Sequence, residues 1–126
     1  MSQVEKLVPP EHESLKIEVG GSDTVVLAGK ITTRDPGAEL GPFFRAVHDA
    51  AKADGLEELK VDVTKLSFVN SSSIRLFVDW ATWLKNENQP TYVLRFLTDR
   101  TVTWQRTSFV ALTALAKEVV AVQAVT

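Results

Sequence analysis

The chain has 126 residues, 44% of them hydrophobic and 24% charged, which is the size and composition of one ordinary globular domain. Its net charge of −2 gives no electrostatic basis for binding nucleic acid, and the absence of cysteine excludes disulfides and thiolate metal sites. No apolar run is long enough to span a membrane and the start carries no signal-peptide core, so we expect a cytoplasmic protein.

The N-terminal part predicts a tail followed by a hairpin. Residues 1–13 are polar and include a Pro-Pro pair, so we expect a flexible N-terminal tail ahead of a single domain over residues 14–126. Apolar and charged residues alternate over residues 15–19, and a second apolar run covers residues 24–28. The Gly-Gly-Ser-Asp sequence between the two runs is typical of a turn, which predicts that they pair as a β-hairpin.

A helix and a third strand follow. Pro36-Gly37 breaks the chain, and apolar residues then recur at helical spacing over residues 40–51, with Gly55 as the expected stop. His48 lies beside the apolar face of this helix, and we interpret it as a partly buried, hydrogen-bonded side chain rather than a catalytic one. An apolar strand is predicted over residues 59–63.

The C-terminal half repeats the same alternation of helix and strand. A second helix is predicted over residues 74–86, a loop over residues 86–90 and a fourth strand over residues 92–97. Thr98-Asp99-Arg100-Thr101 can cap a last long helix, and residues 119–122 can close the sheet as a short edge strand.

This order of elements predicts an α/β fold with a mixed sheet of four to five strands, an N-terminal hairpin and about three helices. Right-handed strand–helix–strand crossovers place the strand ends, and the helix starts that follow them, along one edge of the sheet. Functional sites of α/β folds lie along that edge. The polar sequence Asn70-Ser71-Ser72-Ser73 would lie there, just before the helix that Ile74 opens.

The serine cluster has two interpretations. Asn and Ser are favoured at helix starts because their side-chain oxygens accept hydrogen bonds from free backbone N–H groups, so the cluster can be a capping sequence. Alternatively, three consecutive hydroxyls are displayed for modification at the positive end of the helix dipole, where a phosphate would be tolerated. Arg75 is then either a partner for that phosphate or an ordinary exposed charge.

A second apolar stripe runs along the same helix. Leu76, Trp80 and Trp83 recur at i, i+4 and i+7 beside the main apolar face. They are either partner-interface residues, also able to support a homodimer, or core residues covered by the last helix through Trp104 and Phe109.

No set of residues predicts an enzyme. The two histidines, His12 and His48, are far apart, and neither a Gly-x-Ser-x-Gly elbow nor a phosphate-binding glycine loop occurs. The adjacent carboxylates Glu57-Glu58 are interpreted as solvated charges, and no metal-ligand spacing is present. We therefore expect neither catalysis, nor a cofactor, nor a metal.

The stretch Asp62-Val63-Thr64-Lys65-Leu66-Ser67-Phe68-Val69-Asn70-Ser71-Ser72-Ser73-Ile74-Arg75 resembles the signature of STAS domains. This fold is shared by anti-sigma-factor antagonists and sulphate-transporter tails. Their usual pattern is Asp-Leu-Ser, three residues, an apolar residue, then Asp-Ser-Ser-Gly-Leu. A weaker resemblance extends over residues 14–122, where Val25-Val26-Leu27-Ala28-Gly29-Lys30-Ile31 is similar to the family's Leu-x-Gly-x-Leu strand.

Two positions depart from the family pattern. Asn70 stands in place of the usual aspartate, and Ser73 in place of the usual glycine. Both changes are similar to a bacterial branch of regulatory phosphoproteins whose loop reads Asn-Thr-Ser-Ser-Ile. In the common pattern the phosphorylated residue corresponds to Ser72, and in the Asn-containing branch to Ser71, so the resemblance leaves both as candidate acceptors.

The resemblance implies an anti-sigma-factor antagonist or a related partner-switching regulator. Such a protein binds a serine kinase/anti-sigma factor when unphosphorylated, is released when that kinase phosphorylates the loop, and is restored by a PP2C-type phosphatase. Nucleotide would belong to the kinase partner. The alternative is a non-phosphorylated STAS module that serves as a subunit of a larger assembly, of a lipid-transport or stressosome-like kind.

Overall fold

A computed structural model describes residues 2–11, 13–87 and 92–125 of the chain. His12 and the predicted loop residues Asn88, Gln89 and Pro90 lie outside the described residues. The elements in chain order are β1 (Leu15–Val19), β2 (Thr24–Ile31), α1 (Pro36–Glu39), α2 (Gly41–Ala53), β3 (Glu58–Asp62), β4 (Leu66–Val69), α3 (Ser71–Lys85), β5 (Val93–Thr98), α4 (Thr103–Leu115) and β6 (Val120–Ala124).

The strands form one mixed sheet in the order β1-β2-β3-β5-β6, with β4 also paired to β2. Among the strand pairs of the described residues, the β1–β2 hairpin is antiparallel and the others are parallel. The predicted α/β class, the N-terminal hairpin and the strand–helix–strand crossovers are confirmed. The predicted numbers of strands and helices are too low, because the described residues form six strands and four helices.

Both unpredicted elements are short and lie beside turn-forming residues. The apolar ends of β4, Leu66 and Val69, are separated by two exposed residues, so its burial pattern does not alternate. The short helix α1 begins at Pro36, which we interpreted as a break; proline is tolerated at the first helical position because its missing N–H would have no helical partner. The Asp35 side chain caps α1 by accepting a hydrogen bond from Ala38 N at 3.2 Å.

Strand β2 is long enough to pair with two strands in succession. Its first half pairs with β3, from Thr24 to Val26, and its last residues, from Gly29 to Ile31, pair with β4. The register of the β2–β4 ladder shifts between Gly29 and Lys30, and the φ of Gly29 is +102°. A Cβ on Gly29 would lie 2.3 Å from the carbonyl oxygen of Ser14, so only glycine is accommodated there.

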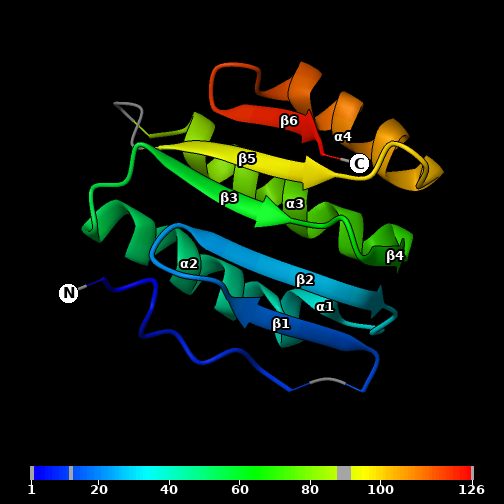
Figure 1. The fold of residues 1–126 in the computed structure, drawn as a ribbon, viewed down its shortest axis with the longest axis horizontal. Coiled ribbons are helices and arrows are strands. Elements are labelled where there is room, and N and C mark those ends of the chain that lie inside the picture. The colour runs from blue at the N-terminus through cyan, green and yellow to red at the C-terminus, as the bar shows by residue number, and fades with distance from the viewer. Residues whose placement is uncertain (1, 12, 88–91, 126) are drawn as a thin grey trace.

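Helices α2 and α3 lie behind the sheet in Figure 1 and cover one of its faces. The core between the layers is aromatic: Phe44 of α2 stacks on Phe77 and Trp80 of α3, at ring-centroid distances of 5.9 and 5.3 Å. Phe96 of β5 contacts Phe109 of α4 at 4.5 Å. These contacts hold α3, and therefore its first turn, at a fixed place on the sheet.

The start of the chain packs against the end of α2. Val4 is fully buried, and the Asp54 carboxylate accepts hydrogen bonds from Ser2 Oγ and from the backbone N–H groups of Gln3 and Val4, at 2.8–3.1 Å. These bonds lower the pKa of Asp54, the bond from Gln3 N–H most. The flexibility expected for residues 1–13 stays a prediction, and polar composition alone did not indicate these contacts.

Candidate functional site

The candidate site is the first turn of α3, which begins at Ser71 rather than at Ile74 as predicted. Asn70 is the N-cap residue, and its Oδ1 accepts a hydrogen bond from Ser73 N at 2.9 Å. Its Nδ2 donates to the carbonyl oxygen of Thr33 at 3.0 Å, and its backbone N–H donates to Ile31 at 3.1 Å. One amide side chain thus caps α3 and ties it to the segment that follows β2.

This geometry gives a physical reason for asparagine at position 70. An ionised aspartate could still accept the bond from Ser73 N, but it has no proton to donate to Thr33. Asparagine at this position therefore adds a contact between two segments of the site.

The three serines have different environments. Ser71 and Ser72 are exposed, whereas Ser73 is fully buried and its Oγ has no hydrogen-bond partner among the described residues. A kinase can reach a hydroxyl only at the first two positions. Both predicted phosphorylation candidates are thus accessible, and Ser73 belongs to the packed helix start.

A groove of about 390 Å³ lies beside these serines. One wall is the segment from Arg34 to Gly37, which leads into α1, and the other is α3. The α3 residues that line it are Ser71, Ser72, Arg75, Leu76 and Asp79. Within the described part of the chain, neither Arg34 nor Arg75 forms an ion pair shorter than 4 Å.

The predicted partner interface at Leu76, Trp80 and Trp83 needs correction. Leu76 and Trp80 are buried within the monomer, and Trp83 is partly buried. The second apolar stripe therefore belongs largely to the core. The last helix was expected to cover it, but α2 packs on Trp80 instead. Phe44 of α2 packs on Trp80, whereas Phe109 of α4 packs on Phe77.

Trp80 also takes part in a buried polar network with Tyr92 and His48. Trp80 Nε1 donates to the Tyr92 hydroxyl oxygen at 2.7 Å, and that hydroxyl lies 2.8 Å from His48 Nδ1. Trp80 can only donate, so the Tyr92 oxygen accepts that bond; a neutral His48 that carries its proton on Nε2 accepts the Tyr92 proton at Nδ1. Nε2 lies 3.4 Å from Glu87 Oε1, without hydrogen-bond geometry.

Burial controls the ionisation of this network. It lowers the pKa of His48, although the nearby Glu87 carboxylate acts in the opposite direction, and it raises the pKa of Tyr92. His48 is fully buried, whereas we predicted that it is partly buried. It is hydrogen-bonded, as predicted. The network lies between α2 and α3, in the core rather than in a cleft.

Sequence reasoning did not identify Arg34, Phe68 or Gln105. Phe68 on β4 is 47% exposed, only two residues before the N-cap. Gln105 is fully buried: its Nε2 donates to the carbonyl oxygens of Val63 (2.6 Å) and Leu66 (3.0 Å), and its Oε1 accepts from Asp99 N at 2.9 Å. Its amide bridges the break between β3 and β4.

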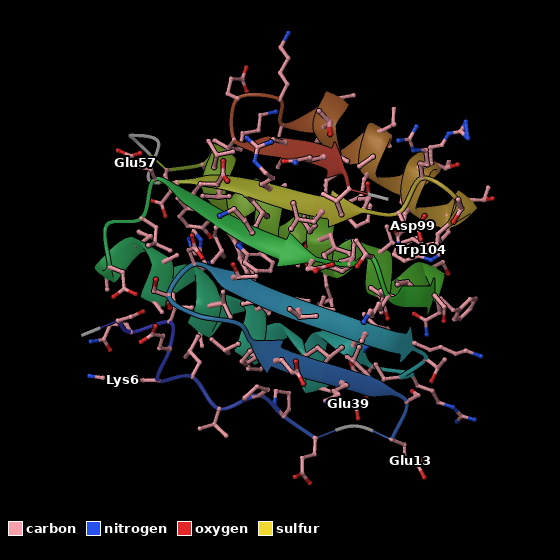
Figure 2. All side chains as sticks on the ribbon, in the orientation of Figure 1. Lys6, Glu13, Glu39, Glu57, Asp99 and Trp104 are labelled. Carbon is pink, nitrogen blue, oxygen red and sulfur yellow. The ribbon has the colours of Figure 1, made fainter. Side chains whose placement is uncertain are left out.

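The start of α4 therefore supports the serine loop from the other side. Asp99 and Trp104 lie at the sheet edge where β4 and the first turn of α3 are found (Figure 2). The predicted capping sequence does not cap α4: the N-cap residue is Val102, and Asp99 Oδ1 instead accepts from the backbone N and hydroxyl of Thr101. No sequence signal distinguished Gln105, which stands between Trp104 and Arg106.

Two other kinds of site are not found in the described residues. No group of three or more His, Asp or Glu side chains there could hold a metal ion. None of the described helices is both long and apolar enough to cross a membrane.

Comparison with known proteins gives one structural match. No protein-family model matches the chain, and no curated protein does. Among solved structures, the chain is similar to the crystal structure of an anti-sigma factor antagonist from Mycobacterium paratuberculosis. The TM-score is 0.48 at 15% sequence identity, over 86% of this chain and 84% of that chain.

Proposed function

We propose that this protein is a partner-switching regulator of the anti-sigma-factor-antagonist type. It binds a serine kinase/anti-sigma factor in its unphosphorylated state, and phosphorylation in the first turn of α3 ends that binding. A PP2C-type phosphatase restores the unmodified form. The observation that carries the proposal is the pair of exposed hydroxyls, Ser71 and Ser72, on a rigidly capped helix start.

The surroundings of the two serines support a surface that binds a protein. Phe68 presents an exposed aromatic ring on the strand that leads into the loop, and aromatic residues are enriched at interface centres. The loop itself is held by the Asn70 contacts to Ile31, Thr33 and Ser73, so a partner meets a preorganised surface.

A phosphate on this surface changes binding without changing the fold. It adds about −1.5 to −2 charges at neutral pH, next to free N–H groups and the positive end of the α3 dipole. The helix start therefore accommodates the modified state. A partner that covers Ser71 and Ser72 has to desolvate the new charge, which opposes binding.

The test begins with intact mass after incubation with ATP and a serine kinase encoded near this protein. We expect the mass to increase by one phosphate, and the increase to be lost in the variant that combines Ser71→Ala with Ser72→Ala. Ser73→Ala is the matched control, because its hydroxyl is buried and should not be modified.

Binding to that kinase is then measured with Ser71→Asp and Ser72→Asp. At least one aspartate should weaken binding while circular dichroism stays unchanged, and the alanine variants should bind normally. If no phosphate is transferred and neither aspartate weakens binding, the switch is wrong. Constitutive membership of a larger assembly, unaffected by these substitutions, would instead favour a non-phosphorylated STAS module.

A further inference from the structure

We propose that Ser72 is the phosphate acceptor and that Arg34 and Arg75 hold its phosphate in the groove between α3 and the segment leading into α1. This inference rests on the proposed function in that it takes the loop to be phosphorylated. It adds the choice of residue and a receptor within the same chain.

The position of Ser72 on α3 distinguishes it from its neighbours. Successive helical residues are about 100° apart, whereas residues three or four apart share a face. Ser72 therefore lies on the face of Leu76, whose Cδ2 is 3.9 Å from the ideal Cβ position of Gly41, the first residue of α2. Leu76 also lines the groove, so Ser72 lies on a face of α3 that borders it.

Ser71 and Ser73 are less well placed. Ser71 lies about 100° round the helix from Ser72, on the side away from Leu76, although it also lines the groove. Ser73 is fully buried. Ser72 has both Arg75 and Leu76 on its face, three and four residues along the helix, whereas Ser71 shares a face with Arg75 alone among the α3 residues that line the groove.

The two arginines are suited to this task. The guanidinium group presents paired donors that match phosphate oxygens, and arginine stays charged at every relevant pH. Arg34 and Arg75 come from separate segments, both line the groove, and neither forms an ion pair elsewhere among the described residues. They are therefore available to a new anion without losing an existing partner.

Two carboxylates also line the groove, and both oppose an added anion. Asp35 directs Oδ1 to the backbone N–H of Ala38, and Asp79 lies one turn beyond Arg75 on α3. In the unmodified protein these acids balance the charge of the two arginines. A phosphate therefore makes the groove negative overall, and both arginines are needed to hold it.

The covalent step is an ordinary phosphoryl transfer from ATP bound by the kinase. Ser72 Oγ forms a bond to the γ-phosphorus, the bond from that phosphorus to the bridging oxygen breaks, and ADP leaves with the electron pair. The hydroxyl proton passes to a base of the kinase. The product then connects α3 to the Arg34 segment through the phosphate.

The test needs neither kinase nor partner. Phosphoserine is incorporated genetically at position 72 in the full chain, and the second pKa of the phosphate is measured by 31P NMR titration. We expect a value about half a pKa unit below that of the same protein in denaturant, since contacts with exposed arginines are modest. Arg34→Gln and Arg75→Gln should each reverse part of this decrease.

Two controls distinguish the effect of Arg34 and Arg75 on the phosphate pKa from the effect of the helix dipole. Arg106→Gln changes an exposed arginine near the start of α4 and should leave the decrease intact. Phosphoserine at position 71 experiences the same dipole and should show a smaller decrease that Arg34→Gln does not affect.

If the second pKa of the phosphate is not lowered, or if neither arginine substitution changes it, Arg34 and Arg75 do not hold the phosphate. A larger decrease in pKa for phosphoserine at position 71 would overturn the choice of Ser72. None of these results bears on the proposed function, which is tested separately by binding to the kinase. Failure of this inference can therefore be distinguished from failure of the proposed function.

Discussion

Replacement of Trp80 by alanine should destabilise the fold far more than replacement of Trp83. Trp80 is fully buried, stacks on Phe44 at 5.3 Å and donates a hydrogen bond to the Tyr92 hydroxyl. Truncation of a buried tryptophan costs about 3–5 kcal/mol through lost burial and the cavity that remains. For a chain of this length that cost corresponds to a fall in Tm of roughly 10–20 °C.

Trp83 provides the matched comparison on the same helix. Its partly buried ring lies between Arg45, 5.0 Å from the ring centroid, and His48, at 5.7 Å. Trp83→Ala should cost about 1–2 kcal/mol, within the usual range for single substitutions and below the cost for a fully buried ring. Urea unfolding followed by circular dichroism measures both variants. Equal losses with equal m-values would refute the assignment of Trp80 to the core and revive the interface prediction.

Three further outcomes are expected at the contacts around the site and the core. Asn70→Ala should lower stability by about 1–2 kcal/mol, because the helix cap is lost. Asn70→Asp should lower it by less, because aspartate still accepts the hydrogen bond from Ser73 N. Chemical denaturation of the two variants measures this difference. Gln105→Ala should cost roughly 2–4 kcal/mol in the same assay because the carbonyl oxygens of Val63 and Leu66 and the N–H of Asp99 each lose a hydrogen bond to a buried amide, and a loss below that of Asn70→Asp would show that the bridge is not needed. Since the pKa of His48 is lowered in the folded state, protons bind the unfolded state more readily, and stability should decline as the pH falls below about 6.5. Thermal denaturation of His48→Gln, which cannot titrate there, should lack that decline, and an unchanged pH profile would contradict it.

The sequence predicted those parts of the fold that depend on periodicity. Alternation over residues 15–19 and helical spacing over residues 40–51 correspond to β1 and α2 because each element buries one face against a continuous core. The same signal failed for β4, whose four residues pair with an irregular stretch of β2 and expose Ser67 and Phe68 together.

The candidate site was predictable in position but not in its contacts. A run of Asn and Ser before an amphipathic helix located the helix start, although three residues too late. The donor role of Asn70 and the approach of Arg34 depend on where the end of β2 lies, which only the folded chain determines. The wide apolar arc of α3 showed that something covers Trp80, but spacing alone could not distinguish α2, α4 and a partner.

The division of β2 between two partner strands has a consequence for local opening. The β2–β4 ladder holds the serine loop, whereas the β2–β3 ladder belongs to the centre of the sheet, and the chain leaves regular pairing between them at residues 63–65. Cooperative units of unfolding follow such boundaries, so the loop can detach from the end of β2 while the central strands keep their hydrogen bonds. A kinase that requires an extended peptide in its own cleft would then need only this local opening, with the rest of the protein still folded.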